Sequence, residues 1–591
     1  MQEVMTPIGL LLTPAVFLLR WRDVRGRLQQ WCLLGVVVFL IMMKNAEGVA
    51  STFLMRIFMD SMFFSDADIF WKCYWVQCGA LVFNVIVTML KGYFQAVVGL
   101  RWREYVTHFF LDLYMSRRSY FEIDTYSREG EKVDNPDQRI QEDAMAVSVR
   151  LLEFVMELLT SFIGLISFAT ILWNLKPMLT VVAICYSVVG SFIGLLIAWK
   201  LVVIQYITQR SEADFRYSLV HIRNNPEAIA FYGGEAREKK ISLSRFEVVV
   251  AAIFRKITWD TTASGYLNFY TTLATMLPSV LLFASYFRGE LDFGSIGQAG
   301  SAFITTMTSL SFVVANMQVI AELSTAANRL GALLVLLRRP EEPGGIEHVN
   351  SKETELQIKG LTCNIPGGEH SIVCDLNASF GSGKTEPVRV LLVGSSGVGK
   401  SSLLRIVAGL WKCGKGEVWR PPNTECLFLP QKPYMPLGNL RMQLLYPNEH
   451  DPVSDTELQR SSPVAKQLTD SDLRSLLASV GLGHLPNRSP EGFESICDWS
   501  RVLSVGEQQR LASVRIFVRL PKLTILDEAT SALPPSDEAQ LYQRLMDSGL
   551  SYLSVGHRDT LIKYHSKVIE LQGGGEWKMY TGKEFADLQA K

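Results

Sequence analysis

The chain has 591 residues, too many for one hydrophobic core, so its length predicts more than one domain. Its 58 Lys and Arg residues balance its 58 Asp and Glu residues, which argues against a nucleic-acid-binding protein because such proteins usually carry a basic excess. Hydrophobic residues make up 48% of the chain and the mean hydropathy is +0.17, both high for a wholly soluble protein. The nine scattered cysteines form no C-x-x-C pair and favour reduced structural thiols over a zinc site.

Residues 1–30 are predicted to form a cytosolic or interfacial lead-in. The apolar stretch from Ile8 to Leu19 precedes an arginine cluster, whereas a signal peptide places its basic residues first.

Six stretches before residue 330 are long and apolar enough to cross a bilayer, which takes about 20 largely apolar residues. They are Trp31–Phe58, Trp71–Val98, Leu151–Leu175, Met178–Ile204, Tyr266–Phe287 and Ser295–Ile320. The first, second and last contain Lys44, Lys91 and several hydroxyl groups, a composition that suits helices lining a polar path.

The loops between these stretches predict their orientation. The segment 101–150 is rich in arginine, whereas the loop from Asp60 to Asp68 carries acids and no base. The positive-inside rule therefore places the N-terminus and the loops 101–150 and 205–260 in the cytosol, and six spans place the C-terminal half there too. Lys176 and Pro177 alone join the third and fourth spans in a tight hairpin on the far side.

The chain is thus predicted to be a multi-domain protein, in which an all-α transmembrane domain precedes an α/β P-loop nucleotide-binding domain. Residues 31–338 form the transmembrane domain, with six helices and two long cytosolic loops, and the Pro-, Gly- and charge-rich segment 339–355 is a linker. Over 356–591, short apolar strands alternate with helical stretches and glycines. The predicted strands are Val388–Val393, Cys426–Leu429 and Leu523–Leu526.

Residues 394–401 match the P-loop pattern G-x-x-x-x-G-K-[ST] at every position, between a predicted strand and a helix-like run from Ser402 to Gly409. In this pattern backbone N–H groups surround phosphates, Lys400 reaches the β- and γ-phosphates, and Ser401 supplies an oxygen to Mg²⁺. The predicted ATP-binding residues are Gly394, Ser395, Ser396, Gly397, Val398, Gly399, Lys400, Ser401 and Ser402.

A second G-K-T sequence, within Gly381–Thr385, lacks the first glycine of the pattern, since Ala378 stands there. Pro387 disfavours a helix after it, so this segment is predicted to be a surface loop.

Two further stretches carry candidate site residues. The strand Leu523–Leu526 is followed by Asp527, which can hold Mg²⁺, and Glu528, which can act as general base for the attacking water. The turn at Ser504 opens a helix and exposes N–H groups and a hydroxyl to an anion. The residues alone leave open a simpler role for Ser504 as a helix N-cap, and an ordinary role for His557.

The order of these motifs resembles the ATP-binding cassette (ABC) family. After the P-loop come Gln431, the run LSVGEQQR at 503–510, LTILDE at 523–528 and His557. Within the family the chain is similar, over almost its full length, to subfamily D and its bacterial relatives. This likeness is carried by Asp134–Ile140, Pro226–Gly234, Leu427–Tyr434 and Ser554–Arg558.

The resemblance implies roles for several residues. It implies that Gln431 senses the γ-phosphate and takes part in the Mg²⁺ site, and that His557 contacts the γ-phosphate beside Glu528. It implies that a coupling loop containing Glu227 and Gly233 transmits motion of the ATPase to the helices. It implies that four signature residues complete the ATP site of the opposite subunit, namely Ser504, Val505, Gly506 and Glu507.

The chain departs from the family pattern at three places. The aromatic residue that stacks on adenine in many cassettes is absent near Ile365 and Pro366. Val505 replaces a common glycine at a tolerant position. Pro534 stands where aspartate usually communicates across the dimer, which puts coupling between the two ATP sites in doubt, though not hydrolysis itself.

These observations predict an ATP-driven half-transporter that uses ATP and Mg²⁺, binds no nucleic acid, and pairs with itself or with a related chain, because one chain has one P-loop and one signature turn. The resemblance implies a fatty acid, an acyl-CoA or a hydrophilic cargo such as cobalamin or a peptide. It implies a peroxisomal or lysosomal membrane in a eukaryote and the plasma membrane in a bacterium. A nucleotide-gated channel or regulatory membrane protein is the alternative, but such cassettes typically lose the base or the histidine.

Overall fold

The computed structural model describes residues 27–126, 135–338, 345–350, 356–364, 371–380, 387–411, 414–447 and 468–589. The chain divides into two compact units, Met1–Arg339 and Pro340–Lys591. Several predictions lie outside the described residues: most of the lead-in, Asp134, the Ile365–Pro366 position and the surface loop Gly381–Thr385.

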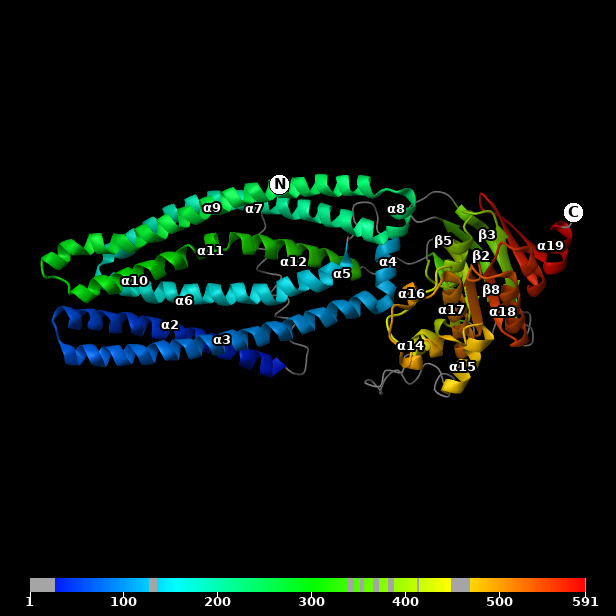
Figure 1. Cartoon of the computed structure of the whole chain (residues 1–591), viewed down its shortest axis with the longest axis horizontal. Helices are drawn as coiled ribbons and strands as arrows, with labels where there is room; N and C mark the ends of the chain where they lie inside the picture. Colours follow the sequence, from blue (N-terminus) through cyan, green and yellow to red (C-terminus); the bar gives the residue numbers. More distant parts are fainter. Residues whose placement is uncertain are drawn as a thin grey trace. The chain divides into compact units, whose positions relative to one another are not determined.

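The described residues of the first unit form helices joined by short turns (Figure 1). Its long helices are α2 (Arg27–Phe63), α3 (Ala67–Met115), α6 (Leu151–Leu175), α7 (Pro177–Asn224), α9 (Glu235–Phe287), α10 (Phe293–Leu310) and α12 (Met317–Leu337). Its short helical segments are η2 (Ser116–Arg118), α4 (Ser119–Tyr126), α5 (Pro136–Gln138), η3 (Arg139–Asp143), η4 (Ala146–Arg150), α8 (Pro226–Tyr232) and α11 (Phe312–Ala315). The predicted hairpin is confirmed, because Lys176 alone separates α6 from α7 and Pro177 occupies the first position of α7.

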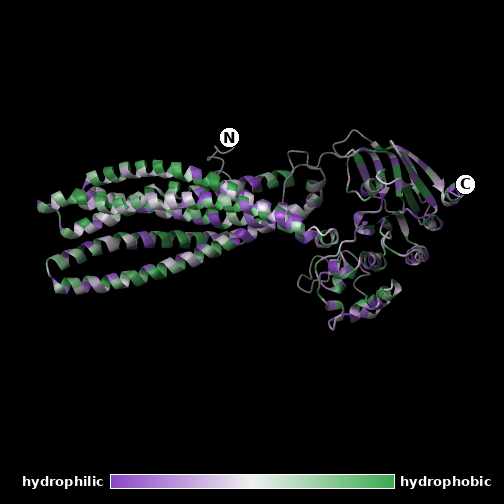
Figure 2. Ribbon diagram, turned by 45° about the horizontal axis from the view of Figure 1, so that its top comes forward, coloured by the Kyte–Doolittle hydropathy of each residue, from purple (hydrophilic) through white to green (hydrophobic). Residues whose placement is uncertain are grey.

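Among the described residues, six helices are long and apolar enough to cross a membrane. Their apolar side chains face outwards to a large extent; Phe39, Leu81 and Val188 are 60%, 65% and 63% exposed. In Figure 2 apolar residues dominate along most of the helical unit, and hydrophilic residues increase towards its α5 and α8 ends. Apolar outer surfaces of this extent suit contact with lipid, and helices satisfy their own backbone hydrogen bonds there.

The predicted sixth span, 295–320, is not one continuous helix in the structure. The structure divides this stretch into α10 and α11 and the start of α12, with breaks at Ser311 and Asn316, and α12 is the helix that meets the length and hydropathy criteria. Helix α10 is rich in Gly, Ser and Thr, yet its Ala299, Ala302 and Phe303 are fully buried among α6, α7 and α9. Small residues let neighbouring helices approach closely, so low hydropathy here reflects packing and not exposure.

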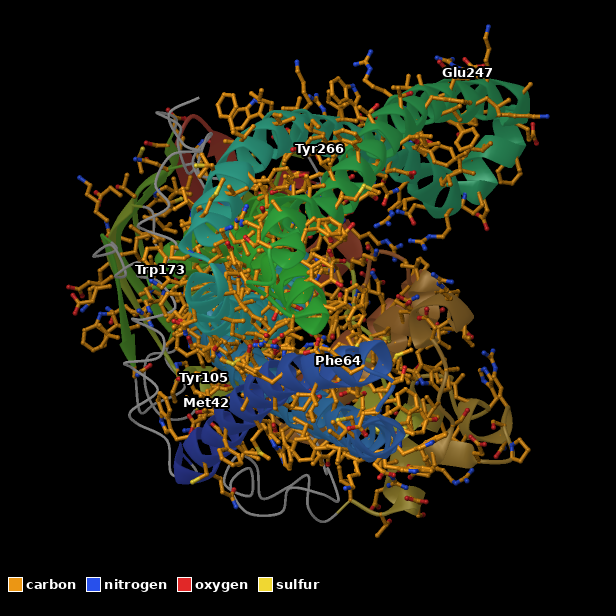
Figure 3. All side chains as sticks on the ribbon, turned by 90° about the vertical axis from the view of Figure 1, so that its left-hand side faces the viewer. Met42, Phe64, Tyr105, Trp173, Glu247 and Tyr266 are labelled. Atoms are coloured by element: carbon orange, nitrogen blue, oxygen red, sulfur yellow. The ribbon has the colours of Figure 1, made fainter. Side chains whose placement is uncertain are left out.

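Aromatic side chains pack α7 against α9 in this bundle; Figure 3 labels one of them, Tyr266 of α9. The rings of Tyr186 and Tyr270 stack with centroids 4.7 Å apart, and the hydroxyl of Tyr266 donates to the carbonyl of Gly190 at 2.7 Å. A Cβ on Gly190 would lie 2.1 Å from the Tyr270 ring, so this close approach requires glycine.

The second unit contains two sheets. A four-stranded sheet has the order β1-β5-β2-β3, and a six-stranded sheet has the order β10-β9-β4-β8-β7-β6. The strands are β1 (Ile346–Asn350), β2 (Leu356–Asn364), β3 (Ser371–Phe380), β4 (Arg389–Gly394), β5 (Gly414–Arg420), β6 (Cys426–Leu429), β7 (Leu523–Asp527), β8 (Ser551–Val555), β9 (Lys567–Gly573) and β10 (Glu576–Thr581). In the larger sheet β9, β4, β8, β7 and β6 are parallel, so their carboxyl ends meet at one edge, where α/β proteins bind ligands.

Part of the predicted linker belongs to this unit instead. Residues 346–350 form β1, which pairs in parallel with β5 and buries Ile346. The short strand was hidden by the Pro-, Gly- and charge-rich residues on both sides of it.

The helices of the second unit are α13 (Lys400–Val407), α14 (Leu440–Leu445), α15 (Asp470–Ser479), α16 (Trp499–Val502), α17 (Val505–Arg519), α18 (Pro535–Asp547) and α19 (Gly582–Gln589). Helix α17 contributes to two apolar cores. Its Ile516 and Phe517 pack in the core beneath the larger sheet, whereas Leu511 and Val514 pack in a separate core with α14 and α15. Motion of α17 relative to either core would therefore disturb well-packed side chains.

Candidate functional site

The P-loop lies between β4 and α13, at the carboxyl edge of the larger sheet. Gly394, Gly397 and Gly399 have φ angles of 145°, 79° and 107°, in the region that L-residues with side chains avoid. A Cβ on Gly399 would also lie 2.1 Å from Ile372 of β3. The backbone therefore needs glycine at these positions to form a loop that can surround phosphates.

The side chain of Lys400 folds back over this loop. Its Nζ donates to the carbonyls of Gly394 at 2.8 Å and Ser395 at 2.9 Å. Burial lowers the pKa of Lys400, while the carboxylates of Glu528 and Asp527 act in the opposite direction. The ammonium is thus held within the loop by groups that anionic oxygens could replace.

Ser401, near the start of α13, contacts Asp527, the last residue of β7. Ser401 Oγ donates to Asp527 Oδ1 at 2.9 Å. Burial raises the pKa of Asp527, and the hydrogen bond from Ser401 opposes this shift. The two predicted oxygen ligands for Mg²⁺, which lie 126 positions apart in the sequence, are therefore adjacent in the fold.

Glu528 lies between two of the predicted catalytic residues. Gln431 Nε2 donates to Glu528 Oε2 at 2.8 Å, and His557 Nε2 lies 2.7 Å from Glu528 Oε1. The Glu528 backbone is left-handed, with φ of 47°, which turns the chain sharply as it leaves β7. The Glu528 side chain is 20% exposed and His557 51%, so the carboxylate is oriented on both sides yet open to solvent.

The signature residues form the N-terminus of α17. Ser504 caps the helix in a reciprocal capping box, in which its Oγ accepts from the N–H of Glu507 and Glu507 Oε2 accepts from the N–H of Ser504 at 2.9 Å. The N–H of Ser504 lowers the pKa of Glu507. The N-cap role of Ser504 is thus real, and the exposed Ser504 and Val505 still present a helix N-terminus to solvent.

The structure brings Lys400, Ser401, Asp527, Glu528, Gln431 and His557 together at one edge of the larger sheet. Among the described residues, no hydrogen bond or ion pair joins the signature residues 504–507 to the P-loop residues 394–402. This separation within one chain leaves the signature turn available to another site.

The sequence did not predict the residues whose hydrogen bonds hold the loops of the site in place. Gln509 bonds to the loops that carry Gln431 and Ser531, and Arg558 donates to the buried Glu538 at 2.9 Å. Their positions beside the motifs at 504–507 and 557 were a signal, since neighbours of a site residue can hold it in place.

The predicted coupling residues lie at the connection between α7 and α9. Glu227 is in the first turn of α8, and Gly233 ends that helix with φ of 60°. Phe231 and Tyr232 of α8 are 88% and 90% exposed. Two adjacent, fully exposed aromatic rings on a short helix favour contact with another surface.

Comparison with known proteins defines the family. The model of the ABC transporter transmembrane region 2 matches residues 25–287, and the model of the ABC transporter domain matches residues 377–531. An uncharacterized ABC transporter ATP-binding protein of Synechocystis sp. is 35% identical over 97% of this chain and 85% of its own length. The chain belongs to the ABC transporter family.

Its relatives include members of the D family of ABC transporters. The chloroplastic ABC transporter D family member 2 of Arabidopsis thaliana is 34% identical over 91% of this chain and 83% of its own length. The human lysosomal cobalamin transporter ABCD4 is 28% identical over 85% of each chain. These matches span both units, as in a half-transporter with one membrane region and one ATPase domain.

The fold is that of an ABC exporter. A bacterial Atm1-family ABC exporter with ATP bound matches with a TM-score of 0.71, covering 94% of this chain and 96% of that one at 15% identity. This half-transporter is therefore a multi-pass membrane protein whose ATPase domain drives transport.

Proposed function

We propose that this ABC half-transporter acts as a dimer in which each ATP lies between the P-loop of one chain and the signature turn of the other. The observation that carries the proposal is the arrangement of Glu528 between Gln431 and His557, next to Lys400 and Asp527. It has the parts needed to hold a triphosphate and to orient a water for attack.

The residues at the P-loop fit Mg²⁺. The oxygens of Ser401 and Asp527 lie 2.9 Å apart, and hard oxygen donors in small number suit Mg²⁺, which keeps several water and phosphate ligands. Ser401 and Asp527 would hold the ion. Gln431 would lie next to it, because its side chain donates to Glu528, the residue that follows Asp527. When bound, Mg²⁺ would neutralise charge on the phosphates.

Glu528 is the proposed general base. It would accept a proton from the attacking water, while His557 and Gln431 hold its two carboxylate oxygens in fixed directions. Lys400 would exchange its contacts with the Gly394 and Ser395 carbonyls for phosphate oxygens, and the N–H groups of the glycine-rich loop would surround them.

The dimer follows from the separation of the two half-sites. Each chain has one P-loop and one signature turn, and the two are not joined within the described chain. A pair of identical chains supplies two complete sites, and a pair with a related half-transporter would do so too. We propose the homodimer, with the α8 helix as the coupling element that passes motion to the spans.

The cargo that the resemblance to subfamily D suggests is a fatty acid or acyl-CoA, or a hydrophilic molecule such as the cobalamin named for the human lysosomal relative. The membrane that the same resemblance suggests is peroxisomal or lysosomal in a eukaryote and the plasma membrane in a bacterium, with the ATPase domain in the cytosol. A channel without a pumping cycle is less well supported, because Glu528 and His557 are both present and in contact.

The test is ATP hydrolysis by the purified full chain in lipid, measured alone and with acyl-CoAs, fatty acids, cobalamin and peptides. Glu528→Gln should lower turnover by about 100-fold or more, because a general base typically contributes that much. Glu425→Gln is the matched control, since Glu425 pairs with Lys522 on the surface at 2.8 Å and should leave turnover unchanged. Equal turnover in wild type and Glu528→Gln would contradict the assigned base, and stimulation by one cargo class would identify that class.

A further inference from the structure

A buried glutamine on α17 joins two loops that carry site residues. Gln509 is 2% exposed. Its Nε2 donates to the backbone carbonyl of Gln431 at 3.3 Å and to Oγ of Ser531 at 3.3 Å, and its Oε1 accepts from the N–H of Ala532 at 3.0 Å. One amide group therefore uses its donors and its acceptor to connect α17 to both loops.

Both loops position Glu528. The first carries Gln431, whose side chain donates to the Glu528 carboxylate at 2.8 Å. The second begins at Glu528 itself, because the N–H of Ser531 donates to the Glu528 carbonyl at 3.0 Å. Gln509 thus holds the backbone on one side of Glu528 and the side chain that orients its carboxylate on the other.

We propose that Gln509 is a positioning residue for ATP hydrolysis, acting through Gln431 and Glu528. The inference rests on the proposed function of this site. A free backbone at Gln431 and at Ala532 would let Glu528 shift relative to the attacking water, and shifts of about 1 Å can cost up to 100-fold in rate.

The same glutamine connects the two half-sites of one chain. Gln509 lies on the helix that Ser504 caps, so the signature turn offered to one nucleotide is tied to the Gln431 and Glu528 loops that serve the other. This connection does not use residue 534, which is proline here.

The neighbouring glutamine provides a matched control. Gln508 is 7% exposed, and its Nε2 donates to the carbonyls of Ser500 and Leu503, both at 2.8 Å. These bonds stay within the segment that leads into α17. Gln508 and Gln509 thus share a residue type, a helix and a degree of burial, and differ in whether they contact the loops around Glu528.

The experiment compares Gln509→Met with Gln508→Met in the full chain in lipid, because methionine keeps the size of glutamine and removes its hydrogen bonds. Both variants should unfold at lower temperature than wild type, since each leaves backbone groups without a partner. Gln509→Met should lower kcat about tenfold or more and change the KM for ATP less than about twofold, because the P-loop is untouched. Gln508→Met should keep kcat within about twofold of wild type.

A second variant covers the case in which Gln509→Met does not fold. Gln509→Glu keeps the length and the acceptor for Ala532 but loses the donors to Gln431 and Ser531, and it should also lower kcat at unchanged KM. Equal kcat losses in Gln508→Met and Gln509→Met, or wild-type kcat in Gln509→Glu, would overturn the inference and leave the ATPase assignment standing. A wild-type chain without ATPase activity would overturn both.

Discussion

Two histidines of the ATPase domain occupy opposite environments. His557 is half exposed and contacts Glu528, whereas His565 is 6% exposed, with Nε2 2.6 Å from Ser554 Oγ and Nδ1 2.7 Å from the Leu561 carbonyl. Burial lowers the pKa of His565 to about 4 from its usual 6.5. His557 is thus accessible to a ligand, whereas His565 is a neutral, hydrogen-bonded residue of the core.

The buried histidine predicts a loss of stability in acid. Between pH 6.5 and 4 the unfolded chain binds a proton at residue 565 that the folded chain does not. As the pH falls through this window, His565 should lower the free energy of unfolding by about 3 kcal/mol in total. Above pH 6.5 its contribution should not change. Thermal unfolding of the full chain at pH 7 and pH 5 measures this. His565→Gln should flatten the pH dependence, and the exposed His108→Gln on α3 should not; identical pH profiles for His565→Gln and wild type would refute it.

The residues proposed to contact phosphate and Mg²⁺ could be predicted from the sequence, whereas the residues that support them could not. Phosphate and Mg²⁺ chemistry demands particular residues at fixed local spacing, so Lys400, Ser401 and Asp527 appear as short motifs. The contacts of Gln509 reach residues 78 and 22 positions away, and no local spacing encodes them. Only the folded chain shows which buried amide meets which loop.

At the scale of elements, the α2–α3 hairpin carries polar contacts between its two apolar helices. Gln77 Nε2 donates to Ser51 Oγ at 2.8 Å, and Asn84 Nδ2 donates to the carboxylate of Glu47. A carboxylate in a membrane-spanning segment is costly unless a partner satisfies it. The hydrogen bond from Asn84 therefore joins α2 to α3 and stabilises the Glu47 carboxylate within the membrane-spanning segment.

Removing that partner should destabilise the hairpin. Asn84→Leu should lower the stability of the full chain in detergent or lipid by about 1–2 kcal/mol, because Glu47 loses its donor. Glu47→Gln in the same background should recover part of the loss, since a neutral amide costs less there. Thermal unfolding of wild type, both single variants and the double variant gives the coupling energy, and strictly additive effects would show that the two side chains do not interact.

Apolar stretches predicted most of the long helices. The predicted boundaries were least accurate where small and hydroxyl residues pack closely between helices. The third predicted span coincides with α6, and four others lie inside α2, α3, α7 and α9. The stretch predicted as the sixth span, 295–320, is divided among α10, α11 and the start of α12, and α10 buries small and hydroxyl residues against three helices. Strand β1 was hidden for a different reason, since five residues are too few to show alternation between turn-forming neighbours.

At the scale of the molecule, the ATPase unit of one chain contains the P-loop half of one proposed ATP site and the signature half of the other. The fold of an ABC exporter and the relatives that match both units support a dimer of such chains. The choice between identical and different partners depends on surfaces that a second chain supplies. A measurement on assembled protein therefore has to test it.

Complementation between two inactive chains tests the shared sites directly. Lys400→Ala removes the P-loop ammonium, and Ser504→Arg places a bulky cation on the exposed signature turn, so each variant alone should lose ATP hydrolysis. A mixed dimer, purified through a different tag on each chain, pairs one intact P-loop with one intact signature turn and should regain hydrolysis. Its mass by light scattering should be twice the 66.4 kDa of one chain. An active species with the mass of a single chain would refute the dimer, and hydrolysis by Ser504→Arg alone would show that the signature turn does not complete the site.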